Sequence, residues 1–157
     1  MRMSQWTRVC GGLAVALLCA PTAQAGQACD DPVVVARRFQ QASMDGLLAT
    51  PAEVLTPALG RLFAEERDCQ EREQGICHLD SDPWLDGQDG EIDAPFAFAR
   101  VAGSAADVAT VEVRYAVWGE PYRVLLSLRQ RGDGCWGVDD MTTQRGSRLR
   151  DQLTEPL

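Results

Sequence analysis

The chain of 157 residues contains no lysine and one histidine, and aromatic residues make up only 6% of it. All 15 basic residues are therefore arginines, and they stand against 23 aspartates and glutamates, which leaves a formal charge of −8. This acidic balance argues against nucleic acid as a partner, because the net field of the protein would repel phosphates. The single imidazole, His78, and the lack of a Cys-x-x-Cys motif argue against a zinc site.

No apolar run reaches the roughly 20 residues that a membrane-spanning helix requires. The longest run, Val9–Ala20, follows a positively charged start, and Ala23 and Ala25 then supply the small residues that a signal peptidase recognises. We therefore expect residues 1–25 to be a secretory signal peptide. Residues 26–157 are expected to form a single periplasmic domain that is neither membrane-spanning nor lipid-anchored.

Cysteine spacing predicts how this exported domain is cross-linked. Without the signal peptide the chain keeps four cysteines, and its 13 arginines and 23 acidic residues give a charge of −10. Four cysteines in an oxidising compartment imply two disulfides with three possible pairings. Cys69 and Cys77 are close enough in sequence to form the easiest local bridge, which leaves Cys29 and Cys135 for the second.

Three helix starts precede the middle of the chain. Each combines a capping residue with proline at the first helical position, at Asp31-Pro32, Thr50-Pro51 and Thr56-Pro57. We expect the first helix to end at Asp45-Gly46, the second to be short, and the third to end at Gly75. In the third helix we place Glu66 with its charged neighbours on a solvated face.

From residue 94 the hydrophobic period changes from helical to two. Alternation predicts four strands, around Phe96–Val101, Val111–Val117, Val124–Arg131 and Cys135–Met141, with a short closing helix within 146–153. The connections are too short for parallel crossovers, so the strands should form an antiparallel meander. Helices followed by such a meander indicate the α+β class, with the N-terminal helices packed on a four-stranded sheet.

Two segments resemble a known group. With the helices and the meander, Gly134-Cys135-Trp136-Gly137-Val138-Asp139-Asp140 resembles the last strand of the nuclear transport factor 2-like superfamily. The stretch Leu79–Asp89 is similar to one in a family of small exported bacterial proteins of unknown function that share this cone-shaped fold. The resemblance implies a curved sheet with a concave pocket, and it assigns no activity.

The acidic loop between Leu79 and Asp93 is the strongest candidate site. A Ca²⁺ frame starting at Asp82 places Trp84 where an oxygen ligand is required, so this frame lacks one ligand. The interpretation we favour is a turn in which the carboxylates accept local backbone N–H bonds while Trp84 packs inward. The alternative is a loop that presents its side chains to a partner, namely Asp80, Asp82, Trp84, Gln88 and Asp89.

The strands offer two further candidates. Asp140 is a possible general base if it points into the cone, and alternation along a strand allows only one of Asp139 and Asp140 to do so. Arg114 and Arg123 are placed to orient an anionic ligand or a partner carboxylate, and Trp118 and Tyr122 flank the Gly-Glu-Pro turn as interface anchors. Arg114, Trp118 and Tyr122 are therefore predicted to bind a partner together with the residues of the acidic loop.

The sequence therefore predicts a non-enzymatic binding protein with no cofactor, no bound metal and no assigned catalytic residue. Its expected partner is a protein of the cell envelope, including an exported toxin that the chain neutralises, or a small ligand in the cone. The alternatives are a small hydrolase or isomerase that uses Asp140 as base, and a Ca²⁺-stabilised ligand-binding domain.

Overall fold

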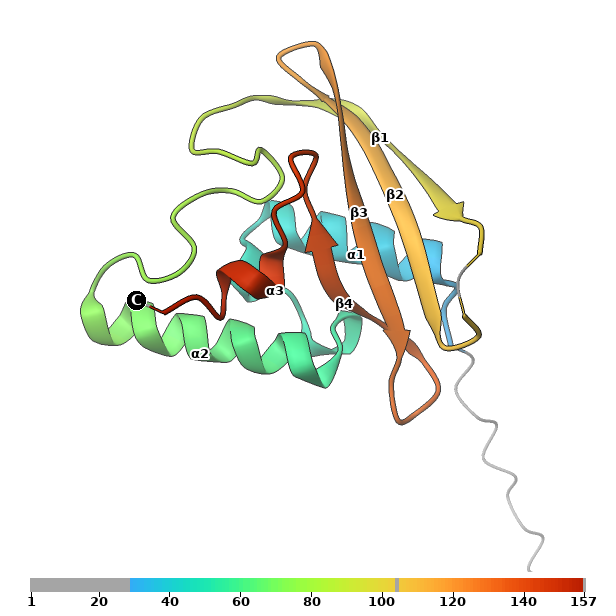
Figure 1. Ribbon diagram of the computed structural model, residues 1–157, viewed down its shortest axis with the longest axis horizontal. Coiled ribbons are helices and arrows are strands. Elements are labelled where there is room, and N and C mark those ends of the chain that lie inside the picture. The colour runs from blue at the N-terminus through green and yellow to red at the C-terminus, as the bar shows by residue number, and fades with distance from the viewer. Residues whose placement is uncertain (1–28, 104, 157) are drawn as a thin grey trace, which may run out of the picture.

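The computed structural model describes residues 29–103 and 105–156, so the expected signal peptide lies outside it. Two helices, α1 (Pro32–Met44) and α2 (Pro57–Glu73), precede the strands β1 (Ile92–Val101), β2 (Val108–Val117), β3 (Glu120–Gln130) and β4 (Trp136–Thr142), and α3 (Leu149–Gln152) follows them (Figure 1). The α+β class and the antiparallel sheet are confirmed. Among the described helices, none has the length and apolar composition needed to cross a membrane.

The helices begin where capping predicts. The Asp31 side chain accepts a hydrogen bond from the Val33 N–H at 2.8 Å, and Pro32 occupies the first turn of α1. Thr56 caps α2 in the same way through the Leu59 N–H at 3.2 Å. The helix α2 ends at Glu73, two residues before Gly75, because Gln74 adopts the left-handed conformation, with φ of 52°.

The short helix predicted at Thr50-Pro51 is instead a pair of 3₁₀ turns, Leu47–Ala49 and Ala52–Val54. The Thr50 hydroxyl donates to the Leu47 carbonyl oxygen at 2.7 Å, so it closes the first turn and does not cap a helix. The two turns carry the chain from α1 to Leu55, which lies against the sheet.

The strands pair in sequence order, β1-β2-β3-β4. The tip of the β2–β3 hairpin is Trp118-Gly119, so β3 begins at Glu120, inside the turn predicted at Gly119-Glu120-Pro121. The prediction of four strands omits one member of the sheet. Leu55 forms a parallel bridge with Val138 and adds a fifth, single-residue member beside β4. A pattern of alternation cannot reveal such a bridge, since one residue has no period.

Gly137 makes this bridge possible. A Cβ atom on Gly137 would lie 2.7 Å from the Leu55 carbonyl carbon and oxygen, which is closer than real Cβ contacts allow. The bare backbone of β4 therefore lets the 55–56 segment approach, and the Thr56 N–H donates to the Val138 carbonyl oxygen at 2.8 Å.

Both predicted disulfide pairs are present. Cys29–Cys135 joins the residues before α1 to the residue before β4, with a sequence separation of 106. Cys69–Cys77 joins the last turns of α2 to the following loop, with a separation of 8. The cross-links therefore hold both the segment just before α1 and the loop after α2 against the rest of the domain.

Candidate functional site

Trp84 is buried, which contradicts the reading in which it faces a partner. Its indole packs against Phe39, Phe96 and Tyr115 with ring centroids 5.9–6.1 Å apart, and its Nε1–H donates to the Ser43 hydroxyl at 2.9 Å. The Tyr115 hydroxyl donates to the Trp84 carbonyl oxygen. Trp84 thus anchors the acidic loop to α1 and β2, as the inward-packing interpretation predicts.

The carboxylates of the acidic loop serve separate structural bonds. Asp82 accepts from the Trp84 N–H at 2.8 Å, Asp86 from the Thr143 hydroxyl at 2.9 Å, and Asp93 from the Gly119 N–H at 2.7 Å. These three residues are the first, fifth and last positions of the Ca²⁺ frame that starts at Asp82. In the described part of the chain, no three His, Cys, Asp or Glu side chains come close enough to hold a metal.

The remaining loop candidates lie on the outside. Asp80 and Asp89 are exposed, and the Gln88 amide donates to the Asp80 carbonyl oxygen at 3.3 Å. This contact uses the backbone of Asp80 and not its carboxylate. Asp80, Gln88 and Asp89 stay candidates for partner contact.

The prediction that Glu66 lies on a solvated face of α2 is wrong. Its carboxylate is fully buried and accepts from the His78 N–H at 3.2 Å, the Leu79 N–H at 3.1 Å and the Gln70 amide at 2.7 Å. The Nδ1 of His78 lies 2.6 Å from the Glu66 Oε2. Sequence spacing contained the signal, because Glu66 follows Leu59 and Phe63 along the buried stripe of the helix.

Burial alone would raise the pKa of Glu66, but these hydrogen bonds, led by the one from Leu79, outweigh burial and hold the pKa below its ordinary value of 4.5. Glu66 therefore contributes stability above that pH, and the contribution is lost as the pH falls through the lowered pKa. His78, the only histidine, acts here as a partner of a buried carboxylate that ties the loop to α2.

We expect Glu66→Gln to lower the free energy of unfolding by about 2 kcal/mol at pH 7, because an amide cannot accept from all of these donors. The difference from the unmodified chain should shrink as the pH falls through the lowered pKa of Glu66, where the carboxyl group becomes neutral like the amide. Urea unfolding at pH 7 and pH 3 measures the free energy of unfolding of both chains. Glu65→Gln, an exposed neighbour on α2, is the control, and an equal loss there would contradict the role assigned to Glu66.

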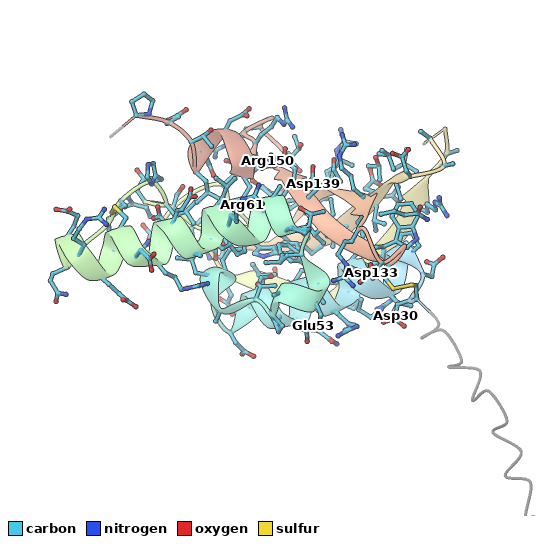
Figure 2. All side chains as sticks on the ribbon, turned by 90° about the horizontal axis from the view of Figure 1, so that it is seen from below. Asp30, Glu53, Arg61, Asp133, Asp139 and Arg150 are labelled. Carbon is cyan, nitrogen blue, oxygen red and sulfur yellow. A yellow bond between two sulfur atoms is a disulfide. The ribbon has the colours of Figure 1, made fainter. Side chains whose placement is uncertain are left out.

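Asp139 and Asp140 do not alternate between the faces of β4 as predicted. Ser127 pairs with Asp140 and Leu128 pairs with Val138, so Asp139 is an extra residue in a β-bulge. The Asp139 carboxylate accepts from Arg129 at 3.2 Å and Arg150 at 2.9 Å, and Figure 2 shows Asp139 beside Arg150. The bulge therefore gives two adjacent carboxylates to the same group of arginines.

Asp140 is buried, but all of its acceptor capacity is in use. One oxygen accepts from Nε and Nη2 of Arg148 at 2.9 and 2.6 Å, and the other from the N–H groups of Met141 and Arg150 at 2.9 and 3.1 Å. The hydrogen bonds that Arg148 donates to Asp140 raise the pKa of Arg148 above its usual value. Proton abstraction by Asp140 would first require breaking this ion pair, so its geometry favours a structural role over that of a general base.

The hairpin of β2 and β3 contains the remaining candidates. Arg114 lies directly opposite Arg123, and both pair with Glu112, Arg123 at 3.2 Å. Tyr122 is half-buried, packs against Tyr115 with ring centroids 5.4 Å apart, and donates its hydroxyl to the Leu85 carbonyl oxygen at 3.2 Å. Burial raises the pKa of Tyr122, so this phenol stays a hydrogen-bond donor across the physiological range.

Trp118, at the hairpin tip, is 66% exposed. Its backbone is held in the left-handed region, with φ of 51°, by a bond from the Trp118 N–H to the Glu91 carbonyl oxygen at 3.0 Å. The next N–H, that of Gly119, donates to Asp93. The largest exposed aromatic side chain in the described residues is therefore presented on a turn that is fixed at two successive N–H groups.

Two hollows lie near the loop. One, of about 600 Å³, is mainly apolar and lies between the α1–α2 connection and the acidic loop, with Met44, Leu47 and Pro83 in its wall. The other, of about 440 Å³, is polar and includes His78, Asp80 and Arg148. Neither has Asp140 in its lining, and the interior between the sheet and the helices is filled by buried side chains, among them Phe39, Phe63, Trp84 and Met141.

No model of a protein family matches the chain, and comparisons with curated proteins and with solved structures likewise find no match, so the candidate site rests on its own geometry.

Proposed function

We propose that this chain is a non-enzymatic, exported protein that binds another protein of the cell envelope through the β2–β3 hairpin, with Trp118 as the anchor. The observation that carries the proposal is the 66% exposed indole on a fixed turn. Tryptophan and arginine are enriched among the few residues that dominate protein interfaces. A rigid turn also loses little conformational entropy when its side chain is buried by a partner.

The proposed export has separate support. Two disulfides persist in oxidising compartments such as the periplasm. A chain exported by a signal peptide at residues 1–25 would be found there after the peptide is cleaved. An exported toxin that the chain neutralises and a resident envelope protein are the two partner types, and the identity of the bound protein distinguishes them.

The nuclear transport factor 2-like cone is likewise a proposal. It is supported by the order of elements, with α1 and α2 before an antiparallel meander whose last strand carries Trp136 and the Asp139–Asp140 pair. An experimental structure that fails to superpose on a known cone over most of the sheet would contradict it.

Photo-crosslinking tests the proposed function. A benzoylphenylalanine at position 118 is expected to give one discrete protein adduct in the fraction released by osmotic shock, in a chain that begins at Gly26. The same probe at Arg72, an exposed residue near the far end of α2, is the matched control and should give none.

Competition then measures the contribution of the indole. The unmodified chain should suppress the adduct, and Trp118→Ala should do so at least about 30-fold less well, which corresponds to an interface anchor of about 2 kcal/mol. The stability of Trp118→Ala should stay within about 0.5 kcal/mol of the unmodified chain, because the side chain is exposed. Equal adducts at 118 and 72, or none at 118, would refute the proposal.

A further inference from the structure

The outer face of the sheet, on the side opposite the core, gathers arginines from three elements. Arg114 and Arg123 point outward from β2 and β3, since their neighbours Val113, Tyr115 and Val124 point into the core. Arg129, Arg148 and Arg150 pair with the carboxylates of the β4 bulge. We call this set the arginine face; its members are Arg114, Arg123, Arg129, Arg148 and Arg150.

Each ion pair of the arginine face is asymmetric in exposure. The Glu112 side chain is 12% exposed, whereas those of Arg114 and Arg123 are 66% and 62% exposed. Asp140 is 3% exposed and its partner Arg148 is 53% exposed. The carboxylates are covered and the guanidinium groups face solvent, so a chain with a net charge of −8 presents a positive surface here.

Folding alone does not account for this arrangement. The register places Arg114 directly opposite Arg123, and like charges in that position are destabilising. Glu112 compensates only one of the two charges. Asp139 likewise binds both Arg129 and Arg150, so guanidinium donors exceed the carboxylate oxygens available to them. The spare donors are directed to solvent, where a partner can use them.

We infer that the partner of the hairpin presents a carboxylate-rich surface, which the arginine face binds through charge-assisted, bidentate hydrogen bonds. This inference rests on the proposed function and names the chemistry of its partner. Arg123 and Arg129 are six residues apart on β3, which is roughly 20 Å along the strand. That length suits one side of an interface of standard size, about 800 Å² per partner.

The position of Trp118 favours a protein as the carrier of these carboxylates. It follows Arg114 by four residues on the same hairpin, roughly 13 Å along the strand, so one partner can contact both. A nucleic acid or an anionic membrane would meet the net negative field of the whole chain at distances beyond this face. An acidic protein surface of limited extent meets mainly the local positive charge.

Fluorescence anisotropy with a labelled ten-residue peptide rich in glutamate tests the inference at about 20 mM salt, where the long Debye length leaves ionic contacts weakly screened. The variant is Glu112→Gln/Arg114→Gln/Arg123→Gln, which removes the shared carboxylate so that no buried charge is left unpaired. Arg72→Gln is the control, because it changes the net charge by the same amount at a site remote from the sheet. A glutamine peptide of equal length controls for contacts that do not require charge.

We expect the glutamate peptide to bind the unmodified chain and Arg72→Gln equally, to bind the triple variant at least tenfold more weakly, and the glutamine peptide not to bind. Equal binding by the triple variant, equal weakening by Arg72→Gln, or binding of duplex DNA or phosphatidylglycerol vesicles in place of the peptide would overturn the inference. Urea unfolding of the triple variant shows whether it is folded. If it is not, the same comparison with Arg114→Lys/Arg123→Lys, which keeps the charges and loses the bidentate geometry, decides the question.

The crosslink at position 118 separates the two proposals. An adduct that persists undiminished in the triple variant leaves the proposed function standing and refutes the arginine face as its partner surface. Loss of the adduct in the triple variant, with Arg72→Gln unaffected, supports both. Absence of an adduct from every chain refutes the proposed function, while the peptide assay still decides whether the arginine face binds carboxylates.

Discussion

Replacing Trp84 with alanine is expected to lower the free energy of unfolding by about 3–5 kcal/mol. The change would leave a cavity lined by Phe39, Phe96 and Tyr115. The Ser43 hydroxyl would also lose the hydrogen bond that it accepts from the indole N–H. The loop from 79 to 91 would also lose its link to α1. Urea unfolding followed by circular dichroism measures the loss.

Trp118→Ala is the matched control for this result, since it removes the same side chain from an exposed turn. Its unfolding midpoint should barely move. Partner binding is expected to show the opposite order. Trp118→Ala should bind the partner more weakly, whereas the folded fraction of Trp84→Ala should bind it normally. A Trp84→Ala chain as stable as the unmodified one would show that the indole does not anchor the loop.

Removing the Cys29–Cys135 bond should destabilise the domain more than removing Cys69–Cys77. The first closes a loop of about 100 residues, for which the chain-entropy model gives about 4.7 kcal/mol, whereas a loop of about 8 residues gives roughly 2.5 kcal/mol. Urea unfolding of the paired substitutions Cys29→Ser/Cys135→Ser and Cys69→Ser/Cys77→Ser compares the two.

The local bond has a second effect that a loop-entropy argument omits. It lies beside His78, whose backbone and ring both bind Glu66, so its removal also loosens the segment that covers this carboxylate. If the Cys69–Cys77 pair proved the more important, the anchoring of that segment, and not chain entropy, would dominate. Combining Glu66→Gln with the loss of the local bond would then give less than the sum of the two effects.

Local signals in the sequence predicted much of the fold. Asp31-Pro32 and Thr56-Pro57 start helices through bonds that involve only neighbouring residues, and a period of two locates strands whose one face is buried. The disulfide pairs followed from spacing and elimination. Each of these features depends on residues that are close in sequence or on a repeating pattern.

The features that sequence reasoning missed depend on contacts between distant segments. The charge of Glu66 predicts exposure to solvent, and only the hydrogen bonds from the loop that folds over it, twelve residues later, offset the cost of its burial. The bulge at Asp139 adds one residue to β4, and the composition of the strand does not reveal it. Arg129 and Arg150 meet only through that bulge, so neither was a candidate for the site.

The covered edge of β4 limits the ways in which this protein can be recognised. Leu55 and Thr56 occupy one end of that edge and Arg148 bridges to Thr142 at the other, so few free backbone groups are left there to accept an added strand. The opposite edge, β1, contains Pro95, which has no N–H to donate, beside an irregular register. Both edges thus discourage strand addition and edge-to-edge aggregation. A partner must therefore bind the side chains of the sheet and not add a strand to it.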